Sequence, residues 1–187
     1  MIKIIGICGK KQSGKSSVSR YLVYQGYYER PFAAPLKSAV MEMFQMTKDQ
    51  VDGDSKEMID KYWKVSPRYV MQKFGTEMMR ETLVSCMPDL SWVKDDFWIR
   101  SMEKWYIDFH KRKPDIGIAI PDIRYINESN WVKKNGGEIW KIERPGLANE
   151  DSHKSENQNI KYDKLIVNDG TLEELDDKIM KAMNEKI

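Results

Sequence analysis

A glycine-rich loop near the N-terminus constrains this chain more than any other segment. The loop, Gly9–Ser16, reads Gly-Lys-Lys-Gln-Ser-Gly-Lys-Ser and fits the pattern G-x-x-x-x-G-K-[ST]. It directly follows the apolar run Ile2–Cys8, and the segment after it, Ser16–Gln25, carries apolar residues at helical spacing. We therefore expect a buried strand, a tight phosphate-binding turn and a helix, in that order. A purely structural turn is the alternative, and it does not explain the flanking strand and helix patterns.

The residue types in this loop suit phosphate binding. Glycines allow a tight turn in which successive backbone N–H groups point at phosphate oxygens, and the following helix adds its positive end. Lys15 can then reach the β- and γ-phosphates of a nucleotide, and the Ser16 hydroxyl can bind Mg²⁺. Binding of a nucleotide is therefore the expectation, but the loop alone does not identify the phosphate acceptor.

Composition excludes several other classes of protein. The chain has 187 residues, which suits one compact domain, and its 31 basic and 29 acidic residues give a net charge of +2. This balance is too even for a nucleic-acid polymer as the main partner, so any phosphate binding must be local. No apolar stretch approaches the roughly 20 residues that cross a bilayer, and we expect no membrane insertion.

The cysteines and the N-terminal residues bear on the compartment. Cys8 and Cys86 are far apart and lack the spacing of a metal site. The N-terminal residues do not show a basic segment followed by an apolar signal region. We expect a reducing, cytoplasmic location, which would be the host cytoplasm if the protein is viral.

Strand and helix patterns alternate along the whole chain and predict an α/β fold. We expect a mostly parallel central sheet flanked by helices on both faces, with a long polar segment at 145–161 that is a loop or a small lid. A polar, glycine-interrupted segment at 47–54 is expected to be a loop. The expected strands are 2–8, 30–34, 116–120, 138–143 and 162–167, and the expected helices are 16–25, 35–44, 66–86, 91–111, 127–135 and a last one capped by Thr171.

In such a sheet the ligand site lies at the carboxyl ends of the strands. Cys8-Gly9, Pro121-Asp122 and Asn168-Asp169 each follow a predicted strand and are expected to converge there. Asp122 could hold Mg²⁺, directly or through water, or accept a substrate hydrogen bond, and Arg124 could neutralise the oxygens of a transferring phosphoryl group. A local ion pair between Asp122 and Arg124 that closes a loop is the alternative.

The predicted helix at 66–86 carries a polar stripe, Arg68, Gln72, Thr76 and Arg80, at four-residue steps. Arg68 could bind a phosphate, and Gln72 could contact a base edge or a sugar. On spacing alone, an ordinary solvated face is the better interpretation of this stripe. Lys37 is a candidate ligand of an acceptor phosphate, although an exposed lysine is the usual case.

Two other groups of residues have a functional and a structural interpretation. Arg144, His153 and Lys154 flank or lie in the polar lid segment, where cations could cover bound phosphates, but a surface loop fits almost equally well. Trp98 and Trp131 could stack on a base, although aromatic residues at helical spacing are more often part of a core.

Four stretches together resemble one family. They are Gly9–Ser16, Pro67–Arg80 with its core Gln-Lys-Phe-Gly-Thr-Glu, the segment Asp122–Glu128, and Arg144–Gly146 followed by His153–Glu156. The chain resembles the bacteriophage-type deoxynucleoside monophosphate kinases, a branch of the P-loop nucleoside monophosphate (NMP) kinases. The segment Val167–Leu172 also resembles the loop that NMP kinases place beside the adenine. A virus or phage origin is implied only by this family.

The resemblance implies that the γ-phosphoryl group of ATP is transferred to a deoxynucleoside 5′-monophosphate (dNMP), giving a diphosphate (dNDP), as a step of deoxynucleotide biosynthesis. The acceptor phosphate is itself the nucleophile and is already ionised, so positioning and charge neutralisation must dominate. The resemblance also implies ATP and dNMP as small-molecule partners and a homodimer as one possible assembly. The implied roles are Lys15, Arg124 and Arg144 in catalysis; Ser13, Gly14, Lys15, Ser16, Ser17 and Asp169 in ATP binding, with Mg²⁺ on Ser16; and Lys37, Arg68, Gln72, Thr76, Trp98 and Asp122 in dNMP binding within an acceptor-binding region at 35–86 and the strand end.

Two other functions stay open at this point. A kinase of another small phosphorylated metabolite, such as dephospho-coenzyme A, would share the loop and the sheet, but the base-reading stripe argues against it. A nucleotide-dependent switch or assembly ATPase would need a water-orienting residue and a partner surface, and neither is evident in the sequence.

Overall fold

The computed structural model describes residues 4–147 and 159–185, and the chain divides into two compact units. One unit, the sheet unit, is formed by Met1–Phe32 and Tyr106–Ile187, and the other, the helical unit, by Ala33–Trp105. The acceptor-binding region expected at 35–86 falls within the helical unit.

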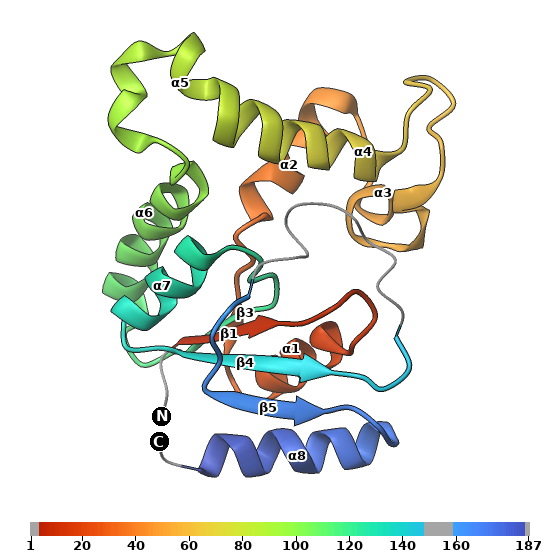
Figure 1. The fold of residues 1–187 in the computed structure, drawn as a ribbon, viewed down its shortest axis with the longest axis vertical. Coiled ribbons are helices and arrows are strands. Elements are labelled where there is room, and N and C mark those ends of the chain that lie inside the picture. Colours follow the sequence, from red (N-terminus) through yellow and green to blue (C-terminus); the bar gives the residue numbers. More distant parts are fainter. Residues whose placement is uncertain (1–3, 148–158, 186–187) are drawn as a thin grey trace. The chain divides into compact units, whose positions relative to one another are not determined.

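The sheet unit is built on five parallel strands in the order β2-β3-β1-β4-β5 (Figure 1). In the middle of the sheet, Gly6 pairs with Ile120 on one side and Ile139 on the other. The predicted α/β class with a parallel sheet is therefore confirmed. The strands are β1 (Ile4–Cys8), β2 (Tyr28–Glu29), β3 (Ile118–Ile120), β4 (Glu138–Glu143) and β5 (Lys164–Val167).

Helices cover both faces of this sheet, as predicted. Helices α1 (Lys15–Tyr24) and α8 (Leu172–Asn184) lie against one face, and α7 (Ile126–Lys134) lies on the other, against β1 and β4 (Figure 1). Burial of this apolar surface is the main force that holds the layers together, at roughly 1.5–3 kcal/mol for each fully buried large aliphatic side chain. The core between the sheet, α1 and α8 includes Ile5, Ile7, Val18, Leu22, Trp140, Ile142, Ile166, Leu175 and Ile179.

A buried ion pair ties the end of α8 to the sheet. The Lys164 ammonium lies 3.2 Å from Glu138 Oε2, and the side chains are 8% and 12% exposed. The ammonium also donates to the carbonyl oxygens of Ala182 at 2.5 Å and Glu185 at 2.7 Å, while Trp140 Nε1 donates to Glu138 Oε2 at 2.9 Å. Both charges are thus hydrogen-bonded, as buried charges must be.

The helical unit has a small core of its own. Its elements are α2 (Ala34–Phe44), α3 (Lys48–Asp52), the 3-10 turn η1 (Asp54–Glu57), α4 (Pro67–Gln72), the π-helical segment η2 (Lys73–Thr82), α5 (Leu83–Cys86) and the 3-10 turn η3 (Pro88–Val93). Leu36, Val40, Met46, Val51, Val70 and Trp98 form the buried centre. Helix α6 (Phe97–Arg112) begins in this unit, and its last residues belong to the sheet unit. There the ring of Phe109 packs on the ring of Tyr28.

Three predicted elements were wrong in place or type. The second strand lies at Tyr28–Glu29 and not at 30–34, and both residues are exposed, so no burial pattern marked it. The segment expected to be a loop at 47–54 contains α3, because Thr47 and Gln50 form a reciprocal capping box. The helix expected from residue 91 begins at Phe97, because Lys94 adopts a positive φ of 50° and interrupts it.

The predicted long helix at 66–86 is present but is not α-helical throughout. Ser66 caps it and Pro67 opens it, as expected, and the π-helical segment then runs through its centre. Within residues 4–147 and 159–185, none of the helices combines the length and the hydropathy that a membrane span requires.

Candidate functional site

The loop between β1 and α1 has the backbone that its glycines predict. Gly9 and Gly14 have φ values of 143° and 108°, which disfavour residues with a Cβ. A Cβ on Gly9 would also collide with the carbonyl oxygen of Ile142 in β4, so the loop starts in close contact with the sheet. Among the described residues no side chain caps the start of α1, and its positive end is therefore available to an anion.

Lys15 carries a positive charge across this loop. Its Nζ donates to the carbonyl oxygens of Gly9 at 2.6 Å and Lys10 at 2.5 Å, so the ammonium is held by the main chain of the loop itself. A phosphate bound to the loop would meet this charge together with the N–H groups of the first helical turn. The role of Lys15 in phosphate binding therefore stays a prediction, made for an ammonium group that lies at this loop.

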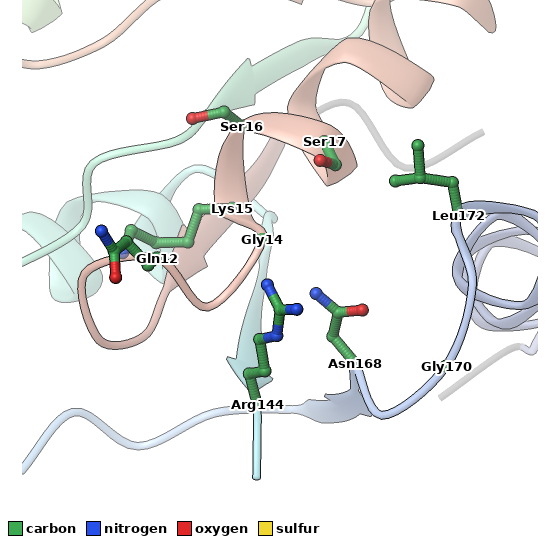
Figure 2. Close-up of a pocket in the computed structure, with 9 residues that line it drawn as sticks. All are labelled: Gln12, Gly14, Lys15, Ser16, Ser17, Arg144, Asn168, Gly170 and Leu172. Atoms are coloured by element: carbon green, nitrogen blue, oxygen red, sulfur yellow. The ribbon is translucent and has the colours of Figure 1, made fainter. Parts of the chain in front are cut away.

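A pocket of about 380 Å³ opens at the start of α1, and its size is that of a small-molecule site. Three segments that are distant in the sequence meet there: the loop, the residue directly after β4, and the turn between β5 and α8 (Figure 2). Of the three segments that were predicted to converge, the loop after Cys8 and the Asn168-Asp169 turn meet at this pocket, whereas neither Pro121 nor Asp122 is among its lining residues. The pocket is lined by Gln12, Gly14, Lys15, Ser16, Ser17, Arg144, Asn168, Gly170 and Leu172.

Two cations and a hydroxyl group give the pocket its chemistry. Figure 2 shows the Arg144 side chain extending from the end of β4 toward the start of α1, where Lys15 begins the helix. Ser16 is exposed in the first turn of α1 and could bind Mg²⁺ alongside the oxygens of a nucleotide. Mg²⁺ commonly needs only one or two protein oxygens beside substrate phosphates, so this donor set fits the ion. No cluster of three or more His, Cys, Asp or Glu side chains suited to a metal occurs in the part of the chain that the structure describes.

Asn168 lines the pocket, as expected for the segment after β5, but the sequence analysis gave its side chain no role. Its Nδ2 donates to the carbonyl oxygen of Ser13 at 2.9 Å, and its backbone N–H donates to Glu143 at 2.7 Å. The side chain therefore links the β5–α8 turn to the phosphate-binding loop. The bond joins residues 155 positions apart, so no local pattern could have indicated it.

Asp169, which was selected, points elsewhere. Its carboxylate pairs with Lys178 at 2.5 Å and is half exposed, and that hydrogen bond is the main reason why the pKa of Asp169 is lowered. Lys178 also donates to the carbonyl oxygen of Val167 at 2.9 Å, so the pair closes the turn at the start of α8. The neighbours Asn168 and Gly170 line the pocket, whereas Asp169 is not among its lining residues.

The segment after β3 is held by hydrogen bonds at both ends. Asp122 Oδ1 accepts from the N–H of Phe32 at 2.9 Å, and Ile123 N–H donates to Ile7 at the end of β1 at 3.1 Å. The buried Glu128 carboxylate accepts from the N–H of Arg124 at 2.8 Å, which fixes the backbone that carries this guanidinium. Sequence reasoning placed Glu128 only within a family segment, although an acidic residue in the first turn of a helix is a known capping signal.

In the helical unit the polar stripe lies between the core and the solvent. Its residues, Arg68, Gln72, Thr76 and Arg80, are all half-buried, whereas the next position on each turn is exposed at Tyr69, Lys73 and Glu77. Arg68 Nε lies 3.5 Å from Glu57 Oε1, and Arg80 donates to the carbonyl oxygen of Asp95 at 3.2 Å. The stripe therefore carries cations held at the edge of the core, and it is not a fully solvated face.

Two further candidates in this unit have clear partners. Lys37 pairs with Asp52 of α3. Trp98 is only 6% exposed and donates from Nε1 to the carbonyl oxygen of Gly75 at 2.8 Å, so it packs in the core beneath the stripe. The predicted lid residues His153 and Lys154 lie outside the described residues.

Comparison with known proteins identifies the family. A profile described as deoxynucleotide monophosphate kinase matches residues 52–179, more than half of the chain. The chain belongs to the deoxynucleotide monophosphate kinase family. A protein of Acanthamoeba polyphaga mimivirus with the provisional name deoxynucleotide monophosphate kinase is 36% identical over 188 residues, covering 97% of this chain and 96% of that protein. The family resemblance that the sequence motifs indicated is therefore confirmed, and so is the kinase class.

One solved structure supports the fold of this family member. The crystal structure of TT1252 from Thermus thermophilus has a TM-score of 0.51 and 18% identity over 96% of this chain and 95% of that one. A likeness at this identity bears on the fold alone. Dephospho-CoA kinase from Campylobacter jejuni covers 97% of this chain and 95% of its own, with 13% identity and a TM-score of 0.45, which is too low to carry an argument.

Proposed function

We propose that this chain is a nucleoside monophosphate kinase that transfers the γ-phosphoryl group of ATP to the 5′-phosphate of a deoxynucleoside monophosphate. Membership of the deoxynucleotide monophosphate kinase family supports phosphorylation of dNMPs. The observation that carries the residue-level proposal is the pocket in which Lys15, Arg144 and the first turn of α1 meet. It offers two cations and a helix N-terminus to one polyanionic ligand.

The proposed donor half of the site is the pocket in the sheet unit. The loop around Ser13 and Gly14 would hold the β- and γ-phosphates, with Lys15 neutralising the transferring group and Ser17 completing the first turn. The nucleoside would lie toward Gly170 and Leu172, with Asp169 supporting this turn through Lys178. Mg²⁺, held by the Ser16 hydroxyl and the phosphate oxygens, would supply positive charge that the developing transition state needs.

The proposed acceptor-binding residues of the helical unit are Lys37 and the polar stripe, and the proposed acceptor-binding residue of the sheet unit is Asp122, after β3. Arg68 would bind the dNMP phosphate, while Gln72 and Thr76 would contact its base or sugar. Lys37 and Asp122 would add polar contacts, and Trp98 would support the stripe from within the core. Arg68 already pairs with Glu57, so binding of the phosphate would exchange one anionic partner for another.

Catalysis in this proposal rests on position and charge. The acceptor phosphate is ionised at neutral pH and attacks the γ-phosphorus directly, so no side chain needs to remove a proton from it. Arg124 and Arg144 would neutralise the charge that spreads over the transferring oxygens. The backbone of Arg124 is fixed by the buried Glu128, which limits the reorganisation required when the guanidinium binds.

A product assay tests the proposal. The purified protein is incubated with ATP, Mg²⁺ and each dNMP in turn, and the nucleotides are separated by anion-exchange chromatography. We expect equal amounts of ADP and dNDP from at least one dNMP. ADP without dNDP would indicate an ATPase or switch, and turnover only with dephospho-coenzyme A would indicate the other kinase class. The Lys15→Ala protein, prepared in the same way, reports any contaminating kinase.

Three properties from the sequence analysis remain predictions of this proposal. They are a cytoplasmic location, a dependence on Mg²⁺ and a homodimer. Removal of Mg²⁺ with EDTA should stop dNDP formation, and restoration by added Mg²⁺ checks that the loss is reversible. Sedimentation velocity over a range of protein concentrations tests the dimer.

A further inference from the structure

The turn after β5 holds one peptide group of the phosphate-binding loop. Asn168 Nδ2 donates to the carbonyl oxygen of Ser13 at 2.9 Å, and the Asn168 backbone is itself tied to Glu143 at the end of β4. Ser13 is 1% exposed, so this contact is made on the buried side of the loop. In Figure 2 the Asn168 amide extends from the turn toward Gly14.

The geometry of a peptide unit gives this contact a consequence. The carbonyl group of Ser13 and the N–H group of Gly14 belong to the same planar trans peptide, and they therefore point in opposite directions. When Asn168 binds the carbonyl oxygen on one side, the N–H of Gly14 is directed to the other side. Gly14 is the cap residue of α1, where backbone N–H groups are expected to bind phosphate.

The packing around Gly14 fits the same function. A Cβ on Gly14 would lie 2.5 Å from Asn168 Nδ2, so the amide group rests directly against the glycine backbone. The opposite end of the loop is fixed independently, because Gly9 lies against the carbonyl oxygen of Ile142. Without Asn168, the loop would keep its anchor on β4 and lose the one on the β5 side.

We propose that Asn168 is a positioning residue that holds the Ser13–Gly14 peptide with its N–H directed at the phosphates of the bound nucleotide. The identity of that nucleotide as ATP rests on the proposed function. Asn168 also lines the pocket together with Gly170 and Leu172. The turn therefore lies beside the proposed nucleoside position and also orients the Gly14 N–H that binds phosphate. In this way it links the nucleoside-binding and phosphate-binding parts of the proposed ATP site.

The test compares Asn168→Ala with a matched control, Asn135→Ala. Asn135 Nδ2 donates to the carbonyl oxygen of Trp131 at 2.8 Å, which is the same type of bond in the same unit, at the end of α7. Asn168→Asp is the second variant, because it keeps the shape of the side chain but replaces the donor with an acceptor that faces a carbonyl oxygen. Calorimetry measures the Kd of ATP and ADP, and steady-state kinetics measures kcat and both KM values.

We expect Asn168→Ala to raise the Kd of ADP and the KM for ATP about tenfold, equivalent to about 1.4 kcal/mol. Because the peptide contacts phosphate in the ground state and in the transition state alike, kcat and the KM for the dNMP should stay within about twofold. Asn168→Asp should weaken nucleotide binding at least as much. Asn135→Ala should lower the thermal unfolding temperature and leave nucleotide binding unchanged.

The proposal is overturned if either Asn168 variant is folded and binds nucleotide as tightly as the wild type, whatever its effect on thermal unfolding. The calorimetric readout is independent of the phosphate acceptor. If the wild-type protein makes no dNDP but binds ADP, and Asn168→Ala weakens that binding, then the proposed function fails while the role of Asn168 stands.

Discussion

Replacing Gly14 with alanine tests two physical costs that meet at one residue. The first is conformational, because φ at Gly14 is 108°, and a left-handed backbone costs an L-residue roughly 1–2 kcal/mol. The second is steric, because the new Cβ would lie 2.5 Å from Asn168 Nδ2 and must displace the amide. Loss of that hydrogen bond adds about 1 kcal/mol. The expected sum is about 2–3 kcal/mol in the free energy of unfolding.

Gly26→Ala is the matched control, since it contains only the first cost. Gly26 lies in the same unit, has a φ of 91°, and has no atom within 4 Å of the point that an alanine Cβ would occupy. Alanine there should cost roughly 1–2 kcal/mol, and both alanines reduce the freedom of the unfolded chain equally. The two variants should therefore differ by about 1 kcal/mol in the free energy of unfolding, and this difference measures the loss of the hydrogen bond made by Asn168.

Urea unfolding followed by circular dichroism measures both stabilities, and calorimetry measures the Kd of ADP. We expect Gly14→Ala to weaken ADP binding about tenfold or more and Gly26→Ala to leave it unchanged. In an Asn168→Ala background, the cost of Gly14→Ala should fall to that of Gly26→Ala, because the displaced group is already absent. Equal destabilisation by the two glycine variants, or unchanged ADP binding by Gly14→Ala, would refute the reasoning.

Three other predictions concern charge and protonation. Lys15→Ala should lower kcat at least about a hundredfold in the dNDP assay while the circular dichroism spectrum stays native, with the exposed Lys181→Ala as control. Arg68→Ala should raise the KM for the dNMP about tenfold to a hundredfold and leave the KM for ATP unchanged, whereas Arg100→Ala in the same unit should change neither; an equal loss for both substrates would contradict the placement of Arg68. Burial raises the pKa of the Cys8 thiol from 9.0 to about 11, so the folded protein keeps a proton there that the unfolded chain loses; stability should therefore fall between pH 9 and 11. Cys8→Ser should flatten this fall in pH-dependent urea titrations, and an unchanged slope would show that Cys8 does not contribute to it.

The sheet could be predicted from the sequence because its signals are local. Strands β1 and β3 are short apolar runs that are buried throughout, and β1 leads directly into the glycine-rich loop. Tyr28 and Glu29 of β2 are exposed at the edge of the sheet, where burial leaves no pattern in the sequence. Helix α3 was missed for a different reason: Thr47 and Gln50 fit the T-x-x-Q capping pattern, but the polar composition of the segment and Gly53 favoured a loop.

The pocket at the start of α1 was predictable in part. Gly14, Lys15 and Ser16 belong to one local motif, and Arg144 directly follows a recognisable strand. Asn168 and Asp169 were both expected near the site, but the role in ATP binding was given to Asp169, because both residues follow β5 and only the direction of each side chain separates them. That direction depends on a hydrogen bond to Ser13 on one side and an ion pair with Lys178 on the other. Neither partner can be inferred from the spacing of residues around β5.

The buried pair of Glu138 and Lys164 restricts how this sequence can evolve. Loss of either side chain alone would leave its partner as an uncompensated buried charge, at a cost of about 3–5 kcal/mol, whereas an apolar pair of similar volume can be neutral. Since Lys164 also binds the last carbonyl groups of α8 and Glu138 also binds Trp140, a replacement must satisfy these groups as well. Substitutions at the two positions should therefore be inherited together, and a single change at either one should survive only in a chain stabilised elsewhere.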